Sequence, residues 1–175
     1  MNVVKRIVLT CLVTASMQAL AQSPVQNSCL DDPRFNQFDF WLGEWRVTDV
    51  NGVHVGDNRI EKTEAGCLIT EHWVNVQGQT GFSMNYFNPL TEQWRQIWVS
   101  APGVEIDYVG GLNEQGAMQL EGTIKYFGSG TSAPFRGTWT RNENGTVRQL
   151  FEQFDDDSGE WTVWFDGLYT LVSTE

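Results

Sequence analysis

The side chains with the clearest chemical potential in this chain are polar groups that alternate with large aromatic residues in short segments. Successive residues of a strand point to opposite faces, so Glu71 shares a face with Trp73, and Gln96 lies between Trp94 and Trp98 on one face of its segment. Aromatic walls with a few polar groups are typical of pockets that hold small organic molecules. The sequence therefore predicts a small-molecule binding site more strongly than any specific reaction.

The candidate ligand-binding residues are the polar and aromatic side chains that share these faces. The tryptophans would stack on a partly apolar ligand, the amides of Asn85 and Gln96 would donate and accept hydrogen bonds, and Arg148 would contact an anionic group. The alternative is that the eight tryptophans form core and rim, with their polar neighbours in solvent. The predicted site comprises Glu71, Trp73, Asn85, Gln96, Trp98, Arg148 and Glu152.

Charged groups inside a barrel need partners, and they could also do chemistry. Glu71 could form a buried ion pair with Arg136 or Arg148, either to bind a carboxylate or as a purely structural contact. Glu71 or Glu152 could instead act as the general acid/base of an isomerase, cyclase or hydratase. An enzyme of this kind is the alternative to a binding protein.

Metal and cofactor chemistry has weak support. His72 lies in a predicted strand and could bind haem iron, although a lone strand histidine is usually structural. Residues 155–160 are acidic but lack the spacing of a calcium loop. The segment Gly81–Asn85 lacks the final glycine of a serine-hydrolase nucleophile elbow. We therefore predict no cofactor and no metal.

Ten short segments rich in β-branched and aromatic residues must position these side chains. Asp32 and Pro33 indicate one short helical turn before them, and Asn51-Gly52 and Asn144-Gly145 suit tight hairpin turns. Short connections favour an all-β antiparallel meander, and closure into an up-and-down barrel of eight to ten strands removes its free edges. A β-sandwich is the alternative architecture. The predicted strands are 44–50, 56–64, 67–77, 80–88, 93–100, 104–111, 117–127, 133–141, 146–155 and 160–172.

Several short motifs lie along the chain, at Phe38–Trp45 (FDFWLGEW), Gly66–Trp73, Gly81–Tyr86, Trp94–Val99, Val147–Gln149 and Phe165–Tyr169. Together they resemble an uncharacterised family of bacterial secreted proteins with this FDFWLGEW signature, over essentially the whole mature chain. The resemblance implies a lipocalin-like (calycin) barrel. Gly43 and Trp45 also resemble the lipocalin entry motif, in which the glycine permits the bend into the first strand and the tryptophan closes one barrel end. The threonine-aspartate-tyrosine motif of lipocalins is absent, so the ligands of transport lipocalins are not carried over.

The start of the chain has the features of a secretory signal peptide. Lys5 and Arg6 precede an apolar run that is too short to span a bilayer and that ends in the small residues of Ala19-Leu20-Ala21. We expect cleavage after Ala21 and a periplasmic or secreted protein without membrane insertion. The predicted organisation is a signal peptide at 1–21, an N-terminal segment with a short helix at 22–42, and a β-barrel domain at 43–175.

Two cysteines, Cys29 and Cys67, would remain after cleavage. In an oxidising compartment such a pair predicts a disulfide; the alternative, metal ligation, lacks a CxxC motif or a histidine cluster. The net charge of −11 argues against nucleic acid as a partner, since phosphates repel an acidic surface. A small-molecule ligand is therefore the predicted partner, and the sequence does not define an oligomeric state.

Overall fold

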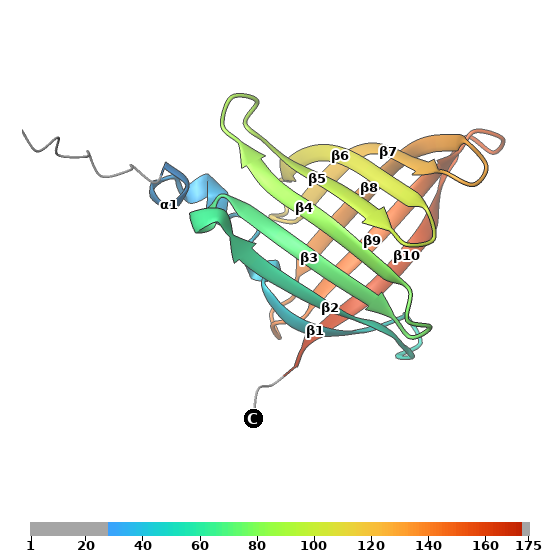
Figure 1. Cartoon of the computed structure of the whole chain (residues 1–175), viewed down its shortest axis with the longest axis horizontal. Coiled ribbons are helices and arrows are strands. Elements are labelled where there is room, and N and C mark those ends of the chain that lie inside the picture. The colour runs from blue at the N-terminus through green and yellow to red at the C-terminus, as the bar shows by residue number, and fades with distance from the viewer. Residues whose placement is uncertain (1–27, 173–175) are drawn as a thin grey trace, which may run out of the picture.

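A computed structural model describes residues 28–172 of the chain, and the predicted signal peptide at 1–21 lies outside this range. Ten antiparallel strands form one closed up-and-down barrel, in which each strand pairs with its sequence neighbours and β1 pairs with β10 (Figure 1). The predicted all-β antiparallel barrel is confirmed at the upper limit of eight to ten strands, and the sandwich alternative is wrong. The strands are β1 (Gly43–Thr48), β2 (His54–Thr63), β3 (Leu68–Asn75), β4 (Thr80–Asn88), β5 (Gln93–Ser100), β6 (Val104–Leu112), β7 (Met118–Tyr126), β8 (Thr131–Arg141), β9 (Val147–Asp155) and β10 (Glu160–Leu171).

The hydrophobic core lies inside the barrel because burial alternates along the strands. In β8, Phe135 and Trp139 are fully buried, while Arg136 between them lies on the outer face. This period of two is the geometric property of a pleated strand. In a closed barrel it sends one face of every strand to a shared interior and leaves the other face to solvent.

The N-terminal segment closes one end of the barrel (Figure 1). It contains α1 (Ser28–Asp31) and two short 3₁₀ helices, η1 (Pro33–Asn36) and η2 (Asp39–Trp41). Asp32 caps η1 by accepting a 3.0 Å hydrogen bond from the backbone N–H of Arg34, as its position before Pro33 predicts. The rings of Phe38 and Trp41 then stack inside the barrel mouth with their centroids 5.0 Å apart.

Covalent and polar contacts fix this segment to the barrel wall. The predicted disulfide between Cys29 and Cys67 is present and joins α1 to the start of β3, just after η3 (Glu64–Gly66). Lys62 of β2 donates to both carboxylate oxygens of Asp39, at 2.6 and 2.8 Å. The indole N–H of Trp45 donates to the backbone oxygen of Trp41 at 2.8 Å. The segment is therefore an integral lid of the barrel.

The contact between β1 and β10 is the shortest ladder in the barrel. It pairs residues 45–48 with residues 168–171, which is four residue pairs, whereas β7 and β8 share nine. The chain enters this region at Gly43, whose φ of +135° is a conformation that L side chains rarely adopt. Closure of the barrel thus depends on a narrow seam. Within residues 28–172, no helix is long and apolar enough to cross a membrane.

Candidate functional site

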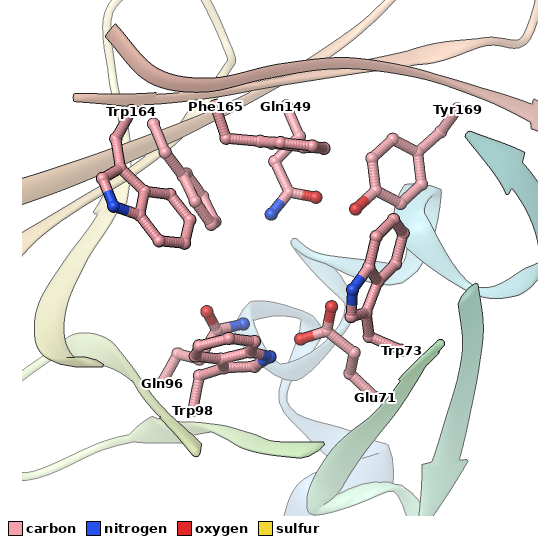
Figure 2. A pocket seen from close by; sticks show the side chains of 9 residues that line it. Glu71, Trp73, Gln96, Trp98, Gln149, Trp164, Phe165 and Tyr169 are labelled. Carbon is pink, nitrogen blue, oxygen red and sulfur yellow. The ribbon is translucent and has the colours of Figure 1, made fainter. Parts of the chain in front are cut away.

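A pocket of about 120 Å³ lies inside the barrel (Figure 2). The pocket residues of β3 and β5 lie toward the turns at 76–79 and 101–103. The N-terminal segment packs at the opposite end of the barrel, against Trp94 and Phe87. Six of the nine lining residues are aromatic. The lining comprises Glu71, Trp73, Gln96, Trp98, Gln149, Phe151, Trp164, Phe165 and Tyr169.

Two opposite parts of the barrel wall contribute these side chains. β3 and β5 supply Glu71, Trp73, Gln96 and Trp98, and β9 and β10 supply the remainder. Figure 2 shows the two groups facing each other across an open centre, with the carboxylate of Glu71 on one side. The pocket therefore has apolar walls and a small number of polar groups, which is the usual make-up of a ligand site.

Inward-facing glycines create the space for the two tryptophans of β3 and β5. Trp73 lies opposite Asn58 and its ring covers Gly56, where an added Cβ would lie 2.5 Å from the indole. Trp98 lies opposite Ser83 and covers Gly81 in the same way, also at 2.5 Å. Each ring can lie flat against the wall only because the glycine beneath it has no side chain.

A β-bulge in β10 places two successive aromatic rings inside the barrel. Val163 pairs with Glu152 and Phe165 pairs with Phe151, so Trp164 is the extra residue of the bulge. Trp164 contacts Phe151 with ring centroids 6.3 Å apart, and Phe165 contacts the same ring at 6.1 Å. Simple alternation would have sent one of these two rings to the outside.

A row of buried polar side chains, the polar belt, runs across the wall beneath the pocket. Asn58 donates from Nδ2 to Oε1 of Glu71 at 2.7 Å, and Ser83 donates from Oγ to Oε2 at 2.7 Å. Asn85 donates to Ser83 Oγ at 2.9 Å and to the backbone oxygen of Ile69 at 3.1 Å. Both carboxylate oxygens of Glu71 thus accept hydrogen bonds from neutral donors.

The polar belt continues from β4 to β6. Gln96 donates from Nε2 to Oδ1 of Asn85, and Tyr108 donates its hydroxyl to Oε1 of Gln96. Gln96 lies directly opposite both partners in the ladder. These cross-strand contacts satisfy side chains that are almost completely buried. The belt therefore fixes the position of Glu71 from five strands, β2 to β6.

Glu71 dominates the electrostatics of the interior because it is the one charged residue that is buried within residues 28–172. Burial raises the pKa of its carboxyl above the ordinary value, and the hydrogen bonds from Asn58 and Ser83 partly oppose that rise. Burial, with the nearby Glu71 carboxylate as a lesser cause, also raises the pKa values of Tyr108 and Tyr169 well above the usual one. Both phenols are thus neutral at physiological pH.

Two buried acceptor atoms in or next to the pocket have no hydrogen-bond partner within residues 28–172. They are Oε1 of Gln149, which lines the pocket, and Oδ1 of Asn58. The amide of Gln149 extends into the open centre in Figure 2. An unpaired buried acceptor is costly, at about 1–3 kcal/mol, unless another molecule supplies a donor.

The structure brings together most of the side chains that the sequence singled out. Glu71, Trp73, Gln96 and Trp98 line the pocket. Asn85 is fully buried and lies behind Ser83 and Gln96 in the polar belt, so it supports the site from below. The binding roles of these residues stay predictions.

The expectation that Arg148 and Glu152 point inward is wrong. Arg148 forms an ion pair of 2.6 Å with Asp166, and Glu152 forms one of 2.7 Å with Arg136. Both pairs lie on the outer face of the barrel, because Arg148 and Glu152 alternate along β9 with the residues that point inward. Glu152 is therefore removed as an acid/base candidate of the pocket, and Arg148 as an anion ligand.

Two related expectations are also wrong. Among residues 28–172 Glu71 has no arginine partner, since its carboxylate is held by Asn58 and Ser83. His72 lies on the outer face, where its ring packs edge-on against Phe82 at 4.9 Å, and cannot reach a haem in the interior. Within the described residues no group of three or more histidine, cysteine, aspartate or glutamate side chains could hold a metal ion.

Sequence reasoning missed the β9 and β10 half of the pocket. For Gln149, Phe151 and Tyr169 the sequence did carry a signal, because alternation places them on the faces of β9 and β10 that are buried. Each face of β9 mixes polar and aromatic groups, however, so the sequence alone does not show which face is inward. For Trp164 and Phe165 no simple signal existed, because the bulge breaks the alternation.

No protein-family model matches the chain, and no curated protein matches it. The fold and the site define its class by themselves: a closed ten-stranded antiparallel barrel with an internal aromatic pocket and a buried carboxylate. Because one fold supports many functions, the functional conclusion must come from the chemistry of the pocket.

Proposed function

We propose that this protein is an exported, calycin-like binding protein that holds a small, partly apolar molecule inside its barrel. The observation that carries the proposal is the pocket itself, in which aromatic walls surround a fixed carboxylate and an unpaired amide oxygen. A barrel wall built for stability alone would fill this space with aliphatic side chains. Membership of the FDFWLGEW secreted family belongs to the same proposal.

The size of the pocket limits the ligand. A cavity of roughly 150 Å³ lined by apolar side chains holds one benzene molecule, and this pocket measures about 120 Å³. The enclosed part of the ligand is therefore comparable to a single small ring or a short branched chain. A longer ligand would extend past Trp164, which is 39% exposed, toward the open end of the barrel, opposite the N-terminal lid.

Export is part of the proposal and rests on two features. The first is the predicted signal peptide at 1–21. The second is the Cys29–Cys67 disulfide, since such bonds form and persist in oxidising compartments. A periplasmic or secreted location follows for the binding protein.

A second candidate function is catalysis by Glu71. A buried carboxyl with a raised pKa, placed in a pocket, is the arrangement that general acid/base enzymes use. Tyr169 lies close by and could polarise a substrate oxygen. An isomerase, cyclase or hydratase would use this pair, and Glu71→Gln would then abolish turnover while binding persists.

Native mass spectrometry of protein purified from its own host tests the binding proposal. We expect a small molecule that co-purifies with the protein and is released on denaturation. We also expect the tryptophan fluorescence to change when a small amine, alcohol or carboxylate probe is added. Trp98→Ala should weaken the binding of such a probe at least tenfold. Trp161→Ala is the matched control, because Trp161 packs on the outer face against Phe154 and Arg136. Absence of any bound molecule, together with no fluorescence response to millimolar probes, would refute the proposal.

A further inference from the structure

We propose that the pocket selects an organic cation, namely a protonated amine with a compact apolar body. Its ammonium group would contact Glu71 and Gln149, and its apolar part would lie between the aromatic rings of the pocket. This inference rests on the proposed binding function and adds the chemical class of the ligand.

The first argument is the charge of Glu71. The hydrogen bonds around it fit an ionised carboxylate: Asn58 offers its amide N–H to Oε1, and Ser83, which already accepts from Asn85, has its own proton left to donate to Oε2. None of the lining residues is a lysine, arginine or histidine. A buried charge needs a partner, so a cationic ligand supplies what the barrel wall lacks.

The second argument is the aromatic wall. The faces of Trp, Tyr and Phe rings are negative and attract cations within about 6 Å of the ring centre. Trp73, Trp98 and Trp164 carry the rings with the strongest attraction, and all three border the same open space (Figure 2). An anionic ligand would be repelled both by these faces and by Glu71.

The third argument concerns hydrogen bonds and distinguishes amines from quaternary ammonium groups. No described residue donates to the buried Oε1 of Gln149, which belongs to the lining of the pocket. Gln149 is 3% exposed, so the pocket is the place from which a donor can come. A protonated amine brings N–H groups for both Glu71 and Gln149, whereas tetramethylammonium brings none.

The fourth argument is the electrostatic field at the open end of the barrel, opposite the N-terminal lid. Five turns lie at that end, at residues 49–53, 76–79, 101–103, 127–130 and 156–159. They carry three aspartates, Asp49, Asp156 and Asp157, and no lysine, arginine or histidine. The chain as a whole has a net charge of −11. Such a field raises the local concentration of cations and slows the approach of anions, more strongly at low salt.

Isothermal titration with three probes that share one branched four-carbon skeleton tests the charge preference. The probes are isobutylamine, isobutanol and isobutyrate at pH 7.5, in phosphate buffer because Tris is itself an amine cation. We expect the amine to bind at least tenfold more tightly than the alcohol, and the carboxylate to show no binding. Tetramethylammonium should bind more weakly than isobutylamine.

Variants then assign the preference to Glu71. Glu71→Gln should remove the at least tenfold advantage of the amine over the alcohol. Glu121→Gln removes the same charge from an exposed position on β7 and should change neither affinity. The ranking of the three probes on the unmodified protein needs no variant, so it decides the question even if Glu71→Gln does not fold.

The outcomes separate the two proposals. If isobutanol or isobutyrate binds as tightly as isobutylamine, the pocket is a ligand site but its preference for cations is refuted. If none of the probes binds and no molecule co-purifies, the binding function itself fails, and the inference fails with it.

Discussion

Ser83 donates a 2.7 Å hydrogen bond to Oε2 of Glu71 from the position directly opposite on the neighbouring strand. Both side chains are buried, with 0% and 4% of their surfaces exposed. The pair shows how the barrel holds a charge in its interior: a ladder neighbour provides the hydrogen bond that water would otherwise provide. This compensation is partial, and the pKa of Glu71 stays raised because burial outweighs the hydrogen bonds.

The raised pKa predicts how stability depends on pH. Between the ordinary value of 4.5 and the raised value in the fold, the native state binds more protons than the unfolded state. The contribution of Glu71 to the free energy of unfolding therefore falls as pH rises through this window, by about 1.4 kcal/mol per pH unit. Glu71→Gln, which mimics the protonated acid, should gain stability relative to the native protein as pH rises above 4.5. Urea unfolding at each pH measures the difference.

The same experiment needs a control for other carboxyl groups. Asp166 is paired with Arg148, which lowers its pKa, so its contribution has the opposite sign and is lost as pH falls. Glu121→Gln, at an exposed position on β7, is the matched control variant. A constant difference between Glu71→Gln and the native protein across the window would contradict the prediction.

The glycines beneath the tryptophans predict a second outcome. In Gly81→Ala the new Cβ would lie 2.5 Å from the ring of Trp98, so the ring must move into the pocket. We expect a loss of about 1–3 kcal/mol in the free energy of unfolding, together with weaker ligand binding. Gly111→Ala is the matched control, since nothing lies within 4 Å of its added Cβ. Equal effects of the two variants on binding would show that Trp98 does not depend on Gly81.

The disulfide predicts a third outcome. Cys29 and Cys67 are 38 residues apart, and the chain-entropy relation gives about 4 kcal/mol of stabilisation for a loop of this length. We expect the double variant Cys29→Ser, Cys67→Ser to unfold at a lower urea concentration. The native protein treated with a reductant should shift to the same midpoint, and the double variant should not respond to the reductant. A native midpoint that is insensitive to complete reduction would overturn this expectation.

The N-terminal lid predicts a fourth outcome. Phe38 is fully buried and contacts Trp41, Trp94 and Trp139 with ring centroids 5.0 to 5.7 Å away. Phe38→Ala removes the ring at the centre of this aromatic cluster and should lower the free energy of unfolding by about 3–5 kcal/mol, which thermal unfolding would detect. Phe127→Ala, at a position that is 56% exposed, should cost far less. Similar losses would mean that the lid contributes little to stability.

The strands and their order could be predicted from the sequence because the signals are local. Alternating apolar residues and turn dipeptides such as Asn51-Gly52 depend on few neighbours, and short turns leave antiparallel pairing as the simple solution. Alternation along a single strand placed Glu71 and Trp73 on one face, and the mix of polar and aromatic residues there favoured the inward direction. These inferences needed no knowledge of the partner strands.

The errors arise where a side chain depends on another strand. Arg148 and Glu152 share a face with Phe154, as Gln149 shares one with Phe151. Only the charged residues of the adjacent strands show that Arg148 and Glu152 pair on the outside. The bulge at Trp164 is likewise a property of the β9–β10 ladder. The polar belt joins five strands, and no single segment of the sequence reveals it.

The narrow seam between β1 and β10 has a consequence for biosynthesis. A ribosome completes β10 last, so β1 has no partner on that side until nearly the whole chain exists. Until then the nascent sheet keeps two free edges that other chains can pair with. Because β10 also carries Trp164, Phe165 and Tyr169, its arrival completes the pocket at the same moment. A chain that stops short of residue 160 should therefore be both unable to bind and prone to aggregate.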